Sequence, residues 1–157
     1  MRVRDATPAD AMPVFALHVA ASRRLPRTEY TDEQVRDWAD KRGEGPERYE
    51  TDDLLVAERN GFVVGFGEWD HADETGVDTA ELVACYVHPD HARSGVGTAL
   101  VERMHDEMRA AGFERAELTA SLNAVGFYDR RGYDRVERFD LEPADVAFPV
   151  VRMARDL

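Results

Sequence analysis

Short runs of β-forming apolar residues recur along the chain and predict seven strands. The first run alternates between apolar and charged positions, which is typical of a strand with one buried face. Asn60 and Gly61 separate the second run from the third, and this dipeptide is the strongest short-range signal for a two-residue hairpin. We therefore expect those two strands to be antiparallel neighbours. The predicted strands span residues 1–5, 53–59, 62–69, 81–88, 115–119, 133–141 and 146–154.

Apolar residues at helical spacing, together with capping signals, predict four helices between these strands. The first helix begins after Thr7, which can cap it, and the second begins at Thr31 with the spacing of a capping box. The third spans residues 97–111 and ends at Gly112, because glycine readily adopts the backbone conformation that terminates a helix. The fourth is a short helix over residues 123–130.

The order of these elements predicts an α/β protein with one mixed sheet. A tight hairpin requires antiparallel pairing, whereas a strand-helix-strand crossover favours parallel pairing. At 157 residues and 43% hydrophobic, the chain has the size and composition of one ordinary domain, 1–157.

The charge balance limits the partners that this chain can have. It carries 32 acidic and 20 basic residues, for a formal net charge of -12, so a nucleic acid would be repelled. Only one basic residue is a lysine. This composition suggests a halophile-like, very salty cytoplasm that screens carboxylates, although a mildly acidic protein from an arginine-favouring organism is the alternative. Without a long apolar run or a leader segment, we expect a soluble cytoplasmic protein that does not bind membranes.

Residues 86–100 lead from a strand through a glycine-bearing loop into the start of a helix. Gly95 and Gly97 allow the backbone to turn tightly, so that successive amide protons face outward at the positive end of the helix dipole. A diphosphate suits this arrangement, although the steric demands of the turn would also select small residues. A Walker-type loop is excluded because no lysine follows Gly97, and a dinucleotide fingerprint is disfavoured because Leu100 occupies its third glycine position.

His88, His91 and Cys85 are the candidates for metal or redox chemistry. No cysteine or carboxylate set at ligand spacing accompanies the two histidines, so we interpret them as exposed loop residues and expect no metal. Cys85 is the lone cysteine and lies in an apolar run. We therefore favour a buried small side chain over a reactive thiol.

Two segments together resemble the signature motifs of the GNAT acyltransferase superfamily. Residues 86–97 read YVHPDHARSGVG and residues 123–133 read NAVGFYDRRGY, in the order and at the spacing of that superfamily. Ala92 stands where arginine or glutamine is usual, which removes one side-chain contact and leaves the backbone cradle unchanged. The resemblance implies the GNAT fold: a mixed, mostly antiparallel sheet of about seven strands with a splayed central pair, flanked by four helices.

The resemblance also implies acetyl-CoA as the co-substrate. The backbone at Tyr86 and Val87 would pair with the pantetheine arm, Asn123 would contact the cofactor near that arm, and Arg130 would approach the adenosine phosphates. Asn123 is also interpreted as the cap of the helix that it begins, and the two roles can coexist. The diphosphate would rest on Arg93, Ser94, Gly95, Val96, Gly97 and Thr98.

Acetyl transfer to an amine needs an acid for the departing thiolate and a base for the ammonium form of the acceptor. The motif match makes Tyr128 the candidate acid, since a phenol is protonated at neutral pH. Without that match, Tyr128 would be interpreted as a core aromatic residue. Glu81 and Glu68 are the candidate bases, because each lies in an otherwise apolar run where desolvation strengthens a carboxylate as a base. For either residue, a solvated charge near a strand end is the alternative.

The acceptor is expected to be a small-molecule or peptide amine. Residues 30–38 are similar to a segment found in a branch of small-molecule GNAT enzymes. We expect Tyr30 and Trp38, together with Arg23 and Arg24, to line an acceptor pocket formed by the first two helices. The alternative is packing for Trp38 and solvation for the two arginines.

A catalytically silent acetyl-CoA sensor is the rival hypothesis. The presence of Tyr128 and a candidate base favours catalysis, because a sensor does not require them. A homodimer is compatible with either role, and we predict its edge at the last strand, on Phe148, Val150 and Val151.

Overall fold

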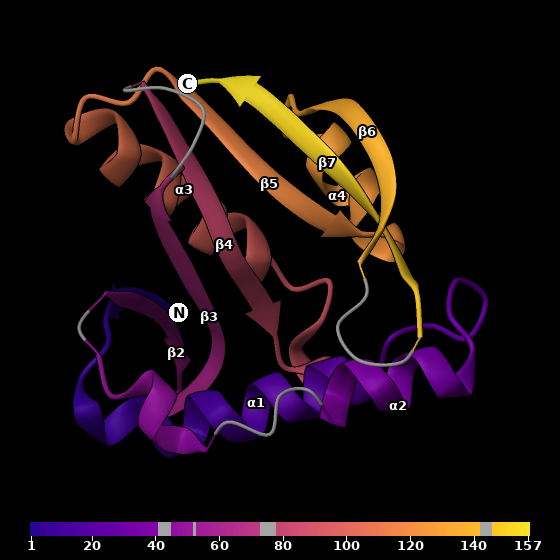
Figure 1. The fold of residues 1–157 in the computed structure, drawn as a ribbon. Helices are drawn as coiled ribbons and strands as arrows, with labels where there is room; N and C mark the ends of the chain where they lie inside the picture. The colour runs from indigo at the N-terminus through magenta and orange to yellow at the C-terminus, as the bar shows by residue number, and fades with distance from the viewer. Residues whose placement is uncertain (41–44, 52, 73–77, 142–145) are drawn as a thin grey trace.

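The computed structural model describes residues 1–40, 45–51, 53–72, 78–141 and 146–157. Within these ranges, seven strands form one mixed sheet in the order β1-β2-β3-β4-β5-β7-β6 (Figure 1). The predicted mixed sheet of seven strands is confirmed. The strands are β1 (Arg2–Asp5), β2 (Leu54–Arg59), β3 (Phe62–His71), β4 (Thr79–Val87), β5 (Arg115–Ser121), β6 (Asp134–Leu141) and β7 (Phe148–Asp156).

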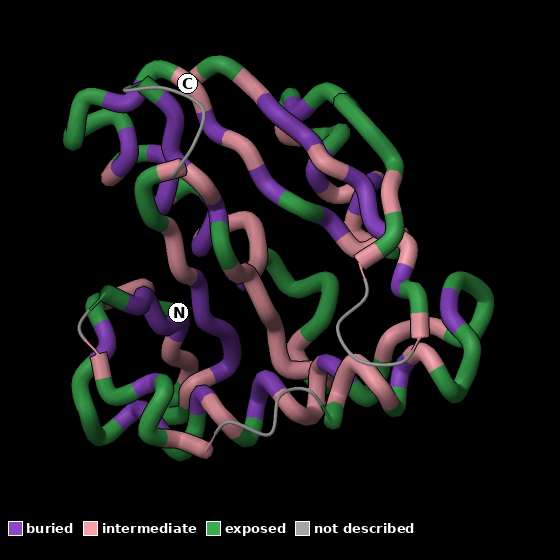
Figure 2. Tube along the Cα trace, viewed as in Figure 1, coloured by how far each residue is buried: buried purple, intermediate pink, exposed green. Residues whose placement is uncertain are grey.

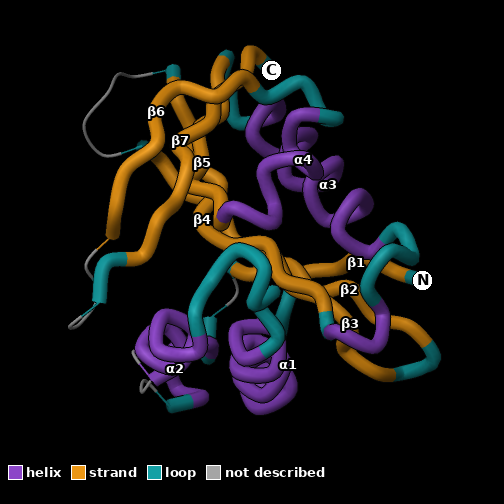
Figure 3. Tube along the Cα trace, turned by 90° about the vertical axis from the view of Figure 1, so that its right-hand side faces the viewer, coloured by secondary structure: helices purple, strands orange, loops and turns teal. Residues whose placement is uncertain are grey.

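Helices cover both faces of the sheet. Helices α1 and α2 lie on one face, and α3 and α4 lie on the other (Figure 3). The described α-helices are α1 (Ala11–Arg23), α2 (Asp32–Asp40), α3 (Val96–Ala110) and α4 (Val125–Asp129), and the 3₁₀ helices are η1 (Pro8–Asp10), η2 (Pro46–Tyr49), η3 (Pro89–His91) and η4 (Leu122–Ala124). In the described ranges, no helix has the length and apolar character needed to cross a membrane.

Local sequence signals account for several element boundaries. Asn60 and Gly61 have φ angles of 52° and 80°, the positive values that a type I′ hairpin needs at both positions. Before α2, the hydroxyl of Thr31 accepts a hydrogen bond from the N–H of Gln34 at 3.1 Å, and the Gln34 side chain accepts one from the N–H of Thr31 at 2.9 Å. The predicted hairpin and capping box are therefore confirmed.

The central strands β4 and β5 are parallel neighbours that separate partway along their length. Their pairing runs from Thr79 opposite Arg115 to Leu82 opposite Leu118. Beyond these pairs the strands diverge toward the side of α1 and α2 (Figure 1). The diverging edges leave backbone groups that an extended ligand can pair with.

A one-residue bulge decides which β4 side chains face which layer. The β3–β4 register shifts at Val83, which has no partner in this ladder. Leu82 and Cys85 both pack on the core that contains α3, whereas Tyr86 packs on the cluster that contains α1. Regular alternation would place Leu82 and Tyr86 on the same face, so the bulge turns the Tyr86 ring toward α1.

The last strand is not an edge of the sheet. Strand β7 lies between β5 and β6, and most of its residues are buried (Figure 2). Phe148, Val150 and Val151 are 2%, 2% and 8% exposed. The prediction that they form a dimer edge is therefore wrong, because β6 pairs along the outer side of β7. A homodimer itself stays a prediction.

Candidate active site

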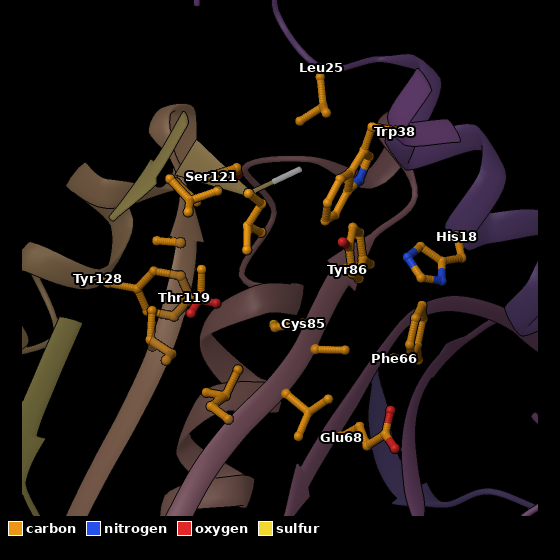
Figure 4. Close-up of a pocket in the computed structure, with 18 of the residues that line it drawn as sticks. His18, Leu25, Trp38, Phe66, Glu68, Cys85, Tyr86, Thr119, Ser121 and Tyr128 are labelled. Carbon is orange, nitrogen blue, oxygen red and sulfur yellow. The ribbon is translucent and has the colours of Figure 1, made fainter. Parts of the chain in front are cut away.

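The opening between β4 and β5 contains a cavity of about 280 Å³, which we call the splay cavity (Figure 4). It adjoins a groove of about 520 Å³ at the N-terminal end of α3, the helix groove. Both spaces are lined by Cys85, Ala124 and Tyr128, so these residues form the junction between them. The splay cavity is lined by His18, Leu25, Trp38, Arg48, Tyr49, Phe66, Glu68, Leu82, Val83, Ala84, Cys85, Tyr86, Leu118, Thr119, Ala120, Ser121, Ala124, Tyr128, Leu141, Phe148 and Val150. The helix groove is lined by Cys85, Val87, His91, Ala92, Arg93, Gly95, Val96, Gly97, Thr98, Asn123, Ala124, Phe127, Tyr128, Arg130 and Arg131.

The helix groove is built around the turn into α3. Arg93 and Gly95 have φ angles of 58° and 85°, a left-handed backbone that reverses the chain before α3 begins at Val96. The N–H groups of a first helical turn have no acceptor within their helix. Among the described residues, no backbone carbonyl accepts a hydrogen bond from the N–H groups of residues 93–98. These donors lie at the positive end of α3, which is the arrangement that a diphosphate cradle requires.

Ser94 braces this turn and does not line the groove. Its hydroxyl donates a hydrogen bond to the His91 carbonyl at 2.5 Å and accepts one from Arg59 at 3.1 Å. Arg59 also donates to the Ser94 carbonyl at 3.3 Å. The hydroxyl of Ser94 therefore makes its hydrogen bonds within the protein. Its backbone N–H is one of the N–H groups of residues 93–98 from which no described backbone carbonyl accepts a hydrogen bond. The sequence did not identify Arg59, which reaches the loop from β2.

The other predicted cofactor-binding residues divide between the two spaces. Val87, Asn123 and Arg130 line the helix groove, whereas the Tyr86 side chain lines the splay cavity because of the bulge in β4. Asn123 lies within η4, and the residue that caps α4 is Ala124. The interpretation of Asn123 as a helix cap is therefore wrong, and its place in the groove leaves it available to a ligand.

The loop histidines have separate surroundings. His88 accepts a hydrogen bond from the N–H of Asp90 at 3.1 Å and so caps η3, while His91 lines the helix groove. Across the described ranges, no group of three or more His, Cys, Asp or Glu residues is placed to hold a metal ion.

Tyr128 lies at the junction of cavity and groove. Its side chain is 6% exposed and faces Cys85 across the gap between the strands (Figure 4). Burial raises the pKa of this phenol well above 10.0, while the positive charge of Arg131 acts in the opposite direction. Tyr128 is therefore a protonated donor throughout the neutral pH range.

Polar groups enter the splay cavity from the side of α1 and η2. Arg48 donates a hydrogen bond to the carboxylate of Glu68 at 3.2 Å. His18 Nδ1 lies 2.6 Å from the hydroxyl of Tyr49, and the His18 ring packs at 4.2 Å on the ring of Tyr86. The cavity thus presents a carboxylate within a largely aromatic wall.

The two predicted bases occupy different places. Glu68 lines the splay cavity, whereas Glu81 lines neither the cavity nor the groove. Glu81 lies opposite Glu117 in the closed part of the sheet, where β4 and β5 still pair. The geometry therefore favours Glu68 as the group that an acceptor would meet.

The two predicted acceptor-binding residues also separate. Trp38 lines the splay cavity and stacks on Phe148 at 4.6 Å, but Tyr30 does not reach the cavity. The Tyr30 hydroxyl donates to the Pro149 carbonyl at 2.7 Å and accepts from the N–H of Leu122 at 2.8 Å. Tyr30 therefore holds the end of β5 against β7, behind the cavity wall.

Several side chains of the site have no local signal in the sequence. They belong to different elements and meet only when α1, η2 and β5 close around the splayed strands, so neither periodicity nor a motif could identify them. Arg23 and Arg24, which we expected near the acceptor, are exposed and line neither space. The unpredicted residues are His18, Arg48, Thr119 and Ser121 in the cavity and Arg131 in the groove.

An open helix turn, a gap between two strands and a buried phenol at their junction together form a site with the donors and the shape that a nucleotide-linked cofactor requires. A sequence profile of the Acetyltransferase (GNAT) family matches residues 16–133. The chain therefore belongs to the GNAT acetyltransferase family, and the predicted family and fold are confirmed.

Similar proteins agree with this assignment. The chain is 42% identical over 62 residues to the L-amino acid N-acyltransferase MnaT of Escherichia coli (strain K12), a match that covers 38% of this chain and 35% of that protein. The chain thus spans about a third of the length of the curated relatives that it matches. A GCN5-related N-acetyltransferase from Rhodopseudomonas palustris superposes with a TM-score of 0.86 at 27% identity, covering 99% of this chain and 95% of that one. The Salmonella typhimurium protein yncA, solved with its cofactor acetyl-CoA, superposes with a TM-score of 0.70 at 24% identity over 100% and 94% of the two chains.

Proposed function

We propose that this chain is an N-acetyltransferase that transfers the acetyl group of acetyl-CoA to a small primary amine by direct attack. The observation that carries the proposal is the junction at Tyr128 and Cys85, where the helix groove adjoins the splay cavity. The groove suits the cofactor and the cavity suits the acceptor, so the reacting atoms would meet beside Tyr128. Membership of the GNAT family supports the same reaction.

The residues of the helix groove fit acetyl-CoA. The open N–H groups of residues 93–98 would hold its diphosphate, and the backbone of Tyr86 and Val87, in the part of β4 beyond its pairing with β5, would pair with its pantetheine arm. Asn123 lines the groove beside that path, and Arg130 adds positive charge at its outer end. When bound, acetyl-CoA supplies an activated thioester, and the chain's residues orient it and move protons.

Tyr128 is the proposed general acid. As the amine nitrogen bonds to the carbonyl carbon, the C–S bond breaks and the CoA sulfur leaves as a thiolate. The corresponding thiol has a pKa of about 8.5, so the thiolate needs a proton. The buried phenol of Tyr128 faces the junction and carries that proton. Burial raises the pKa of Tyr128, and the positive charge of Arg131 opposes this effect, so it would stabilise the negative charge left on the phenol until solvent returns a proton.

Direct attack is favoured over an acetyl-cysteine intermediate. Cys85 is the one thiol of the chain and lies at the junction. Burial raises its pKa to about 12, so at neutral pH it is a protonated thiol and a poor nucleophile. The amine of the acceptor is then the group that attacks the thioester.

Glu68 is the proposed base, with Glu81 as the alternative. An amine acceptor arrives mostly as an ammonium ion, which must lose a proton before its lone pair can attack. Glu68 presents a carboxylate to the splay cavity, where Arg48 holds it in place. Glu81 lies in the paired part of β4 and β5, outside the cavity, and would act only through intervening water.

The cavity walls support a small amine with an apolar body. Five of its lining residues other than Tyr128 are the aromatic side chains Trp38, Tyr49, Phe66, Tyr86 and Phe148. Its volume of about 280 Å³ suits a compact molecule better than a folded protein surface. The name of the Escherichia coli relative, an L-amino acid N-acyltransferase, is consistent with a small acceptor. A peptide amine is the alternative acceptor.

A thiol-release assay tests the proposal. Acetyl-CoA is incubated with a panel of small primary amines and peptides, from low to molar KCl because the chain is so acidic, and free thiol is measured. We expect amine-dependent thiol release that is strongest with an apolar small amine. Thermal stabilisation by CoA without turnover across the panel would instead identify the silent binding module.

The two candidate bases can be separated by matched variants. Glu68→Gln should lower kcat/KM at pH 7 by about a hundredfold, because the amide can still accept from Arg48 but cannot take a proton. Glu81→Gln should lower it by less than about threefold. Raising the pH to 9 should recover much of the Glu68→Gln loss, since more of the amine is then neutral in solution. The reverse ranking of the two variants would make Glu81 the base.

A further inference from the structure

Arg131 lies in the wall of the helix groove and connects its two helices. One guanidinium nitrogen donates a hydrogen bond to the Phe127 carbonyl at 2.8 Å, and the other donates to the hydroxyl of Thr98 at the start of α3. The guanidinium stacks on the Phe127 ring at 3.5 Å. Its Nε is buried and has no hydrogen-bond partner. Arg131 is therefore held in one position at the edge of the diphosphate cradle.

The charge of Arg131 is only partly compensated by the protein's own carboxylates. Among the described residues, no carboxylate forms an ion pair with it, whereas Arg135 pairs with Asp129 at 2.6 Å. Desolvation lowers the pKa of Arg131 and the adjacent Arg130 adds to this effect, while the carboxylate of Glu102 opposes it from a distance. In a chain with 32 acidic residues, a partly desolvated cation that no described carboxylate contacts indicates a site prepared for an anion.

Thr98 faces the same cradle. Its hydroxyl oxygen accepts the hydrogen bond from Arg131, so the hydroxyl proton must point away from the guanidinium. Thr98 lines the groove in the first turn of α3, beside the open N–H groups. The hydrogen bond from Arg131 therefore orients the O–H of Thr98 so that it can donate to a ligand in the cradle. The positive charge of the guanidinium also polarises this O–H.

We propose that Arg131 is the half-buried counter-charge of the bound diphosphate and acts through the hydroxyl of Thr98. This inference rests on the proposed function, because acetyl-CoA provides the diphosphate. It assigns to Arg131 a positioning role that is distinct from that of Arg130, whose side chain is exposed at the outer end of the groove. Thr98 is the residue that touches the ligand.

The test compares CoA affinity in Arg131→Gln, Thr98→Val and the double variant, measured by calorimetry at fixed ionic strength. Each single change should raise the Kd for CoA by about tenfold to a hundredfold. The double variant should be little worse than either, because both changes break the same connection. Thr98→Ser keeps the hydroxyl and should bind nearly as the parent does. Arg135→Gln, which removes a nearby positive charge outside the groove, is the matched control and should leave the Kd unchanged.

A second substrate separates this role from a structural clamp between the helices. S-acetyl-pantetheine lacks the diphosphate, so Arg131→Gln should leave kcat/KM for it near the parental value while lowering kcat/KM for acetyl-CoA. Equal losses with both substrates, additive effects in the double variant or an unchanged Kd would each overturn the inference. Dependence of CoA binding on Arg131 without acetylation of any amine would leave this inference standing and overturn the proposed function. Acetylation of an amine, together with a Kd for CoA that does not change in Arg131→Gln, would overturn this inference and leave the proposed function standing.

Discussion

Replacing Tyr128 with phenylalanine is expected to lower kcat by about a thousandfold while the Kd for CoA stays within about twofold of the parent. The ring would still fill its buried place against Phe127 and Tyr133, so the groove keeps its shape. What is lost is the proton for the leaving thiolate. Steady-state kinetics with the preferred amine, together with calorimetric titration of CoA, separates the two quantities.

The pH dependence of kcat in the parent protein gives a second readout of the role proposed for Tyr128. A raised pKa means that the acid form persists to higher pH, and burial raises the pKa of Tyr128 well above 10.0. The kcat profile should therefore show no decline from this group up to pH about 9. An alkaline decline in kcat that vanishes in Tyr128→Phe would contradict the environment described for the phenol.

Tyr133→Phe is the matched control for this experiment. Tyr133 is also a buried phenol on the same side of the sheet, and its hydroxyl lies 2.7 Å from His105 Nε2, but it lines neither the cavity nor the groove. Loss of that hydroxyl should reduce thermal stability and leave kcat close to the parental value. Equal kinetic losses in the two variants would mean that Tyr128 acts through packing and would remove it from the chemistry.

Gly97→Val is expected to raise the Kd for CoA by at least about a hundredfold. A Cβ atom at Gly97 would lie 3.2 Å and 3.3 Å from two atoms of the Phe127 ring, and 3.6 Å from a methyl of Val87. All three residues line the helix groove, so a branched side chain must push Phe127 and the stacked Arg131 aside or project into the space for the cofactor. Calorimetry or a thermal-shift titration with CoA measures the loss.

Two further variants calibrate this effect. Gly97→Ala should fall between the parent and Gly97→Val, because its single Cβ requires a shift of only a few tenths of an ångström. Ala99→Val places the same branched side chain two residues further along α3, outside the groove, and should bind CoA as the parent does. Normal CoA affinity in Gly97→Val would mean that the diphosphate does not approach the first turn of α3.

Local sequence signals predicted much of the fold and the helix groove in which we propose that the cofactor binds. The hairpin at Asn60 and Gly61, the capping box at Thr31 and the glycine-bearing turn at Gly95 each depend on residues a few positions apart. Backbone conformation at these places is governed by φ preferences and short-range hydrogen bonds, which are readable from the chain. The groove lies where those signals indicated.

The acceptor side was predicted only in part. Trp38 and Glu68 line the cavity as expected, but Tyr30 does not reach it, and Arg48 comes from a segment that carries no motif. The contact of Arg48 with Glu68 joins residues 20 positions apart, and that of Arg131 with Thr98 joins residues 33 positions apart. Such contacts depend on how separate elements pack, which no local pattern specifies.

The sequence by itself determined the family, the order of strands and helices, and the turn that offers its N–H groups to an anion, because these follow from local conformation and motif spacing. The tertiary structure alone decided which side chains meet at the junction. The bulge at Val83 shifts β4 by one residue, so Cys85 packs toward α3 and the Tyr86 ring toward α1. A one-residue shift exchanges the two faces of a strand, and only its pairing with β3 reveals that the shift occurs.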